Sequence, residues 1–213
     1  VTLMDKEQTA RFESACIDAG ARFIGGLLAC AALTQHELTG ADTYYGLTPS
    51  DTRSAPSDFT TMGWFTGLIP ITIPVTAASF RDTARAAQAS FDSGTDTLDV
   101  PYYRVLELAP WLSGPRPNFP VVNFMDAGAP PLSALLTAGL DELNIGIYGD
   151  DRFSYQLSIF VIRLDTETAA TVVFPKNPLA RESIAAYLDA MKSACVRVAD
   201  GRSTLPLHTA ARA

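Results

Sequence analysis

Residues Thr48 to Val75 read TPSDTRSAPSDFTTMGWFTGLIPITIPV, which is the most informative stretch of the chain. Its first part, Thr48 to Asp58, is rich in Pro, Ser, Asp and Thr, which favour turns, so we expect a loop there. Its last part, Gly67 to Val75, is apolar and β-branched and predicts a strand. Pro70 and Pro74 lack the amide donor that an interior strand needs, which places this strand at a sheet edge, at a bulge or beside a substrate channel.

Helices and strands are mixed along the rest of the chain. Apolar spacing and capping residues predict helices that end at Gly20, run from about Ile24 to Gly40, run from Phe80 to Phe91, cover Tyr103 to Leu108, and open at Asn177-Pro178. Further strands are predicted at Thr43–Leu47, Val121–Met125, Leu143–Tyr148, Phe153–Leu164 and Thr168–Phe174. Strands mixed with segregated helices predict an α+β fold (a mixed α/β sandwich), in which helices cover one mixed sheet.

The Gly25-Gly26 pair lies inside the second predicted helix. Each glycine costs roughly 1 kcal/mol there relative to Ala, a cost that close approach of a neighbouring element would offset. No internal repeat or domain boundary is visible, so residues 1–200 are expected to form one domain and residues 201–213 a tail. The chain opens at Val1 without an initiator Met and with a predicted helix almost at once, which we interpret as an internal start within a longer polypeptide.

The composition limits the classes of function. Apolar residues at 47% and charged residues at 18% describe a globular protein. A net charge of −7 argues against nucleic acid or an anionic membrane as the main partner. The longest apolar run, Phe23 to Leu33, is shorter than the roughly 20 residues that a membrane span needs, so no transmembrane segment is expected.

The residues that usually carry catalysis are scarce. The two histidines, His36 and His208, neither adjoin a second histidine nor precede an Asp-Gly, and we expect neither to act as a catalytic base. Cys16, Cys30 and Cys195 share no metal-type spacing, and we interpret them as buried thiols in a reducing cytosol. The sequence also lacks nucleophile-elbow, P-loop and dinucleotide-binding motifs. We therefore predict no catalytic residue and no metal site in this chain.

Two short motifs stand out within the opening stretch, Asp51-Thr52-Arg53 and Gly63-Trp64-Phe65-Thr66-Gly67. They resemble the D-x-R and G-[YW]-F-x-N elements of plant-type BAHD acyltransferases, which share the condensation-domain (chloramphenicol acetyltransferase-like) fold. Gly67 replaces the usual Asn, so a role of that Asn does not transfer. The resemblance implies that Arg53 buttresses the Asp of a catalytic HxxxD loop, a task that suits the rigid donor fork of Arg. A local pair with Asp51 or Asp58, or simple solvation, stays open.

A more specific resemblance spans nearly the whole chain, from about Phe12 to Val198. Its wording is FESACIDAGARFIGGLLACAAL, ELTGADTYYGLTPSDTR, Val122-Asn123-Phe124-Met125-Asp126 and Pro130-Pro131-Leu132. This order is similar to that of the mycobacterial polyketide-associated acyltransferases, and most of all to the branch that esterifies trehalose-type glycolipids. The catalytic HHxxxDG of that family has no counterpart here.

The resemblance implies a reaction and a division of labour. A fatty acyl group would pass from an acyl thioester, either acyl-CoA or carrier-bound, to a sugar hydroxyl, with no permanently bound cofactor. This chain would be the C-terminal, tunnel-forming lobe, and the N-terminal lobe would supply the general-base His. The resemblance also implies that Trp64, Phe65, Thr66 and Asn123 line the tunnel between the lobes. Ordinary core packing for Trp64 and Phe65, and a local hydrogen bond for Asn123, stay open.

The expected partners are the N-terminal lobe, the acyl thioester and the sugar, with a polyketide synthase or lipid transporter as a further partner. The expected location is the cytoplasm, including the inner face of the plasma membrane. A catalytically silent binding or scaffold domain of the same fold is the alternative function. A trimeric enzyme of the chloramphenicol acetyltransferase type is rejected, because Pro206-Leu207-His208-Thr209 lacks the Asp-Gly that should follow its histidine.

Overall fold

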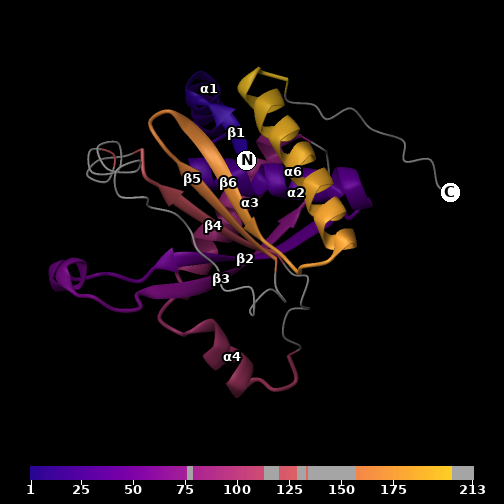
Figure 1. Ribbon diagram of the computed structural model, residues 1–213. Coiled ribbons are helices and arrows are strands. Elements are labelled where there is room, and N and C mark those ends of the chain that lie inside the picture. The colour runs from indigo at the N-terminus through magenta and orange to yellow at the C-terminus, as the bar shows by residue number, and fades with distance from the viewer. Residues whose placement is uncertain (76–78, 113–119, 129–132, 134–156, 203–213) are drawn as a thin grey trace.

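The computed structural model describes residues 1–75, 79–112, 120–128, 133 and 157–202. Within them, one mixed six-stranded sheet has the strand order β1-β6-β5-β4-β2-β3 (Figure 1). The strands are β1 (Thr2–Asp5), β2 (Thr43–Asp51), β3 (Thr66–Pro74), β4 (Val121–Asp126), β5 (Ser158–Arg163) and β6 (Glu167–Val173). The helices are α1 (Lys6–Asp18), α2 (Phe23–Thr39), the 3-10 helix η1 (Pro56–Thr60), α3 (Phe80–Thr95), α4 (Tyr102–Leu108) and α6 (Pro178–Ala199). The α+β prediction, one mixed sheet covered by helices, is confirmed.

The two proline-containing strand positions lie at the edge of the sheet, which is one of the three placements expected from the sequence. β3 is the last strand in the order and pairs with β2 alone among the described strands. Pro70 faces Leu47 and Pro74 faces Thr43 across this antiparallel pair. Because the outer side of an edge strand has no ladder partner, a missing amide donor can be tolerated there.

The end of β2 differs from the prediction. We expected a loop from Thr48, but β2 continues to Asp51, and its last pair with β3 is Asp51 with Thr66. The hydroxyl of buried Thr48 donates a hydrogen bond of 2.7 Å to the carbonyl of Val122 on β4. Pairing with β3 and the side-chain bond to β4 therefore outweigh the local turn preference of this segment.

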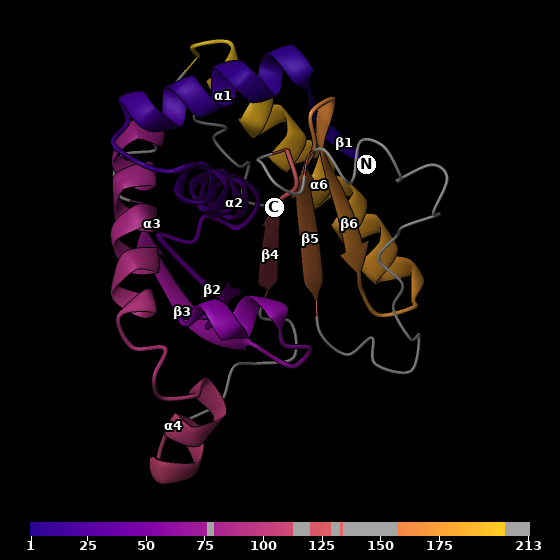
Figure 2. The same cartoon turned by 90° about the vertical axis from the view of Figure 1, so that its left-hand side faces the viewer.

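The helix α2 is the centre of the helical layer. It contacts α1, α3, α6 and β2, and these elements surround it in Figure 2. The sequence predicted one apolar face, whereas every residue from Phe23 to Thr34 is buried. A helix enclosed on all sides must be apolar all round, which the short side chains of this segment allow.

The Gly25-Gly26 pair is explained by close packing, as predicted. A Cβ atom on Gly25 would lie 2.7 Å from Oε1 of Gln88 on α3. A Cβ atom on Gly26 would lie 2.1 Å from Sγ of Cys16 on α1. Both glycines therefore let neighbouring helices approach α2 more closely than any larger residue would.

We predict that Gly26→Ala lowers the free energy of unfolding by about 1–3 kcal/mol, because an added methyl group overpacks the contact with Cys16. Urea unfolding followed by circular dichroism measures this change. Helix propensity alone would make the variant more stable by about 1 kcal/mol. A stabilised variant would therefore contradict the packing described here.

The three cysteines are free and buried, as predicted. They come from α1, α2 and α6, so they lie where three helices meet. Burial raises the pKa of the Cys16 thiol to about 12. A thiol with so high a pKa is almost entirely protonated at neutral pH, and it behaves as a small apolar side chain.

No single helix in the described ranges is both long and apolar enough to cross a membrane. The helices α1 and α2 meet that criterion only as a pair, and the pair is bent by 94° at its break.

Several predictions fall outside the described residues: the strand at Leu143–Tyr148, the start of the strand at Phe153, the Pro130-Pro131-Leu132 motif, His208 and most of the 201–213 tail.

Candidate functional site

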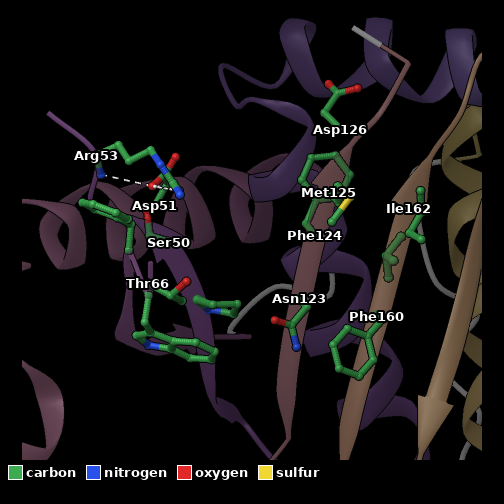
Figure 3. A pocket seen from close by; sticks show the side chains of 14 residues that line it. Ser50, Asp51, Arg53, Thr66, Asn123, Phe124, Met125, Asp126, Phe160 and Ile162 are labelled. Atoms are coloured by element: carbon green, nitrogen blue, oxygen red, sulfur yellow. Dashed lines mark hydrogen bonds and ion pairs between the residues drawn. The ribbon is translucent and has the colours of Figure 1, made fainter. Parts of the chain in front are cut away.

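A groove of about 580 Å³ lies on the face of the sheet that points away from α2 (Figure 3). The strand β4 shows which face this is, because Phe124 stacks on an aromatic ring of α2 with the centroids 5.3 Å apart. Side chains alternate along a strand, so Asn123 and Met125 point to the opposite face. Phe160 and Ile162 of β5 line the same groove. Its floor is thus a largely apolar sheet surface with one amide.

The groove brings together all five residues singled out from the sequence. Arg53, Trp64, Phe65 and Thr66 come from the end of the β2–β3 hairpin, and Asn123 comes from β4. The hairpin is closed beyond its last strand pair by a hydrogen bond of 3.0 Å from the amide of Thr52 to the carbonyl of Phe65. Trp64 is 88% exposed and is not part of the core, whereas Phe65 is half-buried.

The guanidinium of Arg53 is held at one side of the groove by local contacts. Its Nη1 lies 3.3 Å from Oδ1 of Asp51, and its Nε donates a hydrogen bond of 3.0 Å to the carbonyl of Asp58. The ring of Phe65 lies under it, with Cζ 4.4 Å from the ring centroid. The local pairing that the sequence left open is therefore present. It uses only part of the five-donor fork of an Arg side chain.

The described lining of the groove suits binding better than proton transfer. It contains no imidazole and no thiol, and its hydroxyls belong to Ser50 and Thr66. Its two carboxylates both face arginines: Asp51 faces Arg53, and Asp126 faces Arg163. This wall can therefore orient a substrate through its apolar, amide and hydroxyl groups.

Arg163 connects Asp126, at one end of the groove, to the helical layer. Its Nη1 and Nη2 lie 2.8 and 2.7 Å from the two carboxylate oxygens of Glu13 on α1. Nη1 also lies 3.4 Å from Oδ2 of Asp126, and Cζ lies 5.0 Å from the centroid of the Phe23 ring. One guanidinium therefore joins α1, α2, β4 and β5.

We predict that Arg163→Met lowers the free energy of unfolding by about 1–2 kcal/mol, because two carboxylates lose their common partner. The loss is smaller than for a fully buried ion pair, because water screens side chains that are 20% (Arg163), 39% (Glu13) and 34% (Asp126) exposed. Arg104→Met is the matched control, because its pair with Glu107 is exposed on both sides. We expect the control to change stability by less than about 0.5 kcal/mol. Equal losses in the two variants, measured by urea unfolding, would contradict this role.

His36 lies on α2 and is not among the residues that line the groove. Its Nδ1 is 2.9 Å from the carbonyl oxygen of Ala41, just beyond the end of that helix. The described residues contain no group of three or more His, Cys, Asp or Glu side chains that could hold a metal ion.

Sequence reasoning missed much of the groove floor, namely Met125, Phe160 and Ile162. The segments VVNFMD and SIFVIR each have four apolar residues in six, and these fall on both faces of the strand, so their hydrophobic pattern does not separate the open face from the core face. The register of β4 against β5, Asn123 with Phe160 and Met125 with Ile162, places them together. That register is not readable from either segment alone.

The fold is shared with solved structures of two kinds. The condensation domain of the Monacolin K polyketide synthase MokA superposes with a TM-score of 0.72 at 17% identity, covering 92% of this chain and 46% of that one. A PapA2 acyl transferase superposes with a TM-score of 0.85 at 50% identity, covering 94% of this chain and 44% of that one. The fold is that of condensation domains and the acyltransferases related to them. No family model matches the chain.

The close homologues are mycobacterial PapA acyltransferases. Acyltransferase PapA3 of Mycobacterium tuberculosis is 64% identical over 200 residues, which are 94% of this chain and 42% of that protein. The 2'-acyl-2-O-sulfo-trehalose (hydroxy)phthioceranyltransferase PapA1 of Mycobacterium bovis and Mycobacterium tuberculosis is 58% identical, covering 93% of this chain and 38% of that protein. The chain thus spans less than half the length of the curated relatives that it matches.

Proposed function

We propose that this chain forms one wall of an acyl-transfer site that moves a fatty acyl group from a thioester to a sugar hydroxyl of a trehalose-type glycolipid. The observation that carries the proposal is the groove, which gathers all five expected residues yet has no imidazole among its described lining. Homology to PapA acyltransferases more than twice as long supports a second, companion lobe.

In the proposed reaction, an imidazole of the N-terminal lobe accepts the proton of the sugar hydroxyl. The hydroxyl oxygen attacks the thioester carbonyl, an ester bond forms, and the carbon–sulfur bond breaks. The proton then passes from the imidazole to the departing thiolate, so that no cofactor is consumed. The donor is acyl-CoA or a carrier-bound thioester, and both belong to the cytoplasm, where we also place the enzyme, in contact with the inner face of the plasma membrane.

This chain contributes contacts rather than proton transfer. Phe160, Met125 and Ile162 offer an apolar surface for the acyl chain, beside the exposed indole of Trp64. Asn123 offers a donor and an acceptor for the sugar or the thioester carbonyl. Further partners, a polyketide synthase that supplies the acyl group or a transporter that removes the lipid, are proposed from the same chemistry.

The companion lobe also explains the proposed role of Arg53. The described contacts engage Nε and Nη1, and the remaining donors are free to hold a carboxylate of the companion's HxxxD loop. We predict that Arg53→Ala in the longer protein lowers kcat roughly 5- to 30-fold, the range expected for a charge-assisted hydrogen bond of 1–2 kcal/mol. Steady-state kinetics measure this, and unchanged kcat and melting temperature would refute the role.

The activity itself is tested with acyl-CoA and trehalose, by following the release of coenzyme A and the formation of acylated sugar. We predict turnover by the longer protein and none by residues 1–213 alone. Turnover by the isolated chain would overturn the proposed division of labour. Binding of acyl-CoA by the longer protein without any turnover would favour the alternative, a silent binding domain of the same fold.

A further inference from the structure

Asp58 is the hub of the loop that carries Arg53. Its Oδ2 accepts hydrogen bonds from the backbone amides of Ser54, at 3.0 Å, and Ala55, at 2.9 Å. The backbone amide of Asp58 donates a hydrogen bond of 2.9 Å to the carbonyl of Ala55. These three bonds fix the chain immediately after Arg53, at the start of η1.

The carbonyl of Asp58 adds the contact that matters for the groove. It accepts a hydrogen bond of 3.0 Å from Nε of Arg53 and a hydrogen bond of 3.1 Å from the amide of Thr61. The carboxylate and the carbonyl of one residue thus hold both the backbone after Arg53 and the Arg53 side chain itself. The hydrogen bond at Nε limits the rotation of the planar guanidinium of Arg53. The Phe65 ring beneath the guanidinium restricts that rotation further.

We propose that Asp58 is a positioning residue, which sets the direction in which the outer edge of the Arg53 guanidinium points. This inference rests on the proposed function of Arg53 as a contact to the companion lobe. Asp58 does not line the groove and touches no reacting atom in this proposal. It acts through Arg53, by fixing the loop from which that side chain reaches the groove.

The ionisation of Asp58 agrees with this geometry. The Ala55 and Ser54 amides, with a smaller contribution from the charge of Arg53, hold the pKa of the Asp58 carboxyl below its usual range. A carboxyl with a lowered folded pKa stabilises the folded loop above its unfolded pKa of about 3.9. That contribution is lost as the pH falls through the lowered value, so the loop keeps its structure throughout the neutral range.

The first test uses nuclear magnetic resonance on the 213-residue chain. Asp58→Asn keeps the carbonyl that accepts from Arg53 and the size of the side chain, but it removes the charge. We expect hydrogen exchange of Arg53 Nε–H and of the Ser54 and Ala55 amides to accelerate roughly 5- to 30-fold. The matched control is Asp189→Asn, the same change on the exposed surface of α6, which should leave these signals unchanged.

The second test is a double-mutant cycle in the longer protein. If Asp58 acts through Arg53, Asp58→Asn lowers kcat roughly 5- to 30-fold in the parent but by less than about twofold when Arg53 is already Ala. Asp189→Asn should leave kcat unchanged in both backgrounds. A merely structural role of Asp58 would lower kcat equally in both, and that result would overturn the inference.

The two tests distinguish a failure of the role of Asp58 from a failure of the proposed function. Unchanged exchange of Arg53 Nε–H in Asp58→Asn would overturn the role of Asp58, whatever the enzyme does. Global unfolding of that variant would overturn it as well, because Asp58 would then support the whole fold. If the longer protein transfers no acyl group, the proposed function fails, and the exchange experiment still decides whether Asp58 holds Arg53.

Discussion

The register between β2 and β3 is the constraint on which the candidate site depends. Nine residue pairs run from Thr43 with Pro74 to Asp51 with Thr66, so the D-x-R motif and the G-W-F motif reach the same end of one hairpin. A shift of one residue would turn every side chain of the hairpin to the other face of the sheet. The buried face of β3, with three isoleucines in the core, excludes that shift. Core packing on one face therefore aligns the groove on the other.

Much of the fold was predictable because its signals are local. Gly40 ends α2 in the left-handed conformation that glycine adopts readily, with a φ of 71°. Asn177 caps α6 by accepting from the amide of Ala180, and Pro178 follows at the first helical position. Two prolines limited β3 to an edge, a bulge or the side of a channel, and the structure places it at the edge. Each of these features depends on a few neighbouring residues, so one sequence suffices to reveal it.

The features that escaped prediction are set by residues distant in sequence. The continuation of β2 to Asp51 depends on Val122 and on β3, and the burial of α2 on every side depends on three other helices. The candidate residues of the hairpin were found from motif wording, and their meeting in one groove is a finding of the structure. The floor of that groove, Met125 and Phe160 above all, was hidden because both faces of β4 and β5 are apolar.

We propose that the open sheet face is an internal wall of a larger protein, and the oxidation of Met125 tests this proposal. Met125 is 52% exposed in this chain, whereas Met62 is fully exposed and Met191 fully buried. Oxidation of each methionine by dilute hydrogen peroxide can be followed by mass spectrometry. The account predicts that Met125 reacts readily in the 213-residue chain and slows towards the rate of Met191 in the longer protein. Equal rates of Met125 oxidation in the two proteins would contradict it.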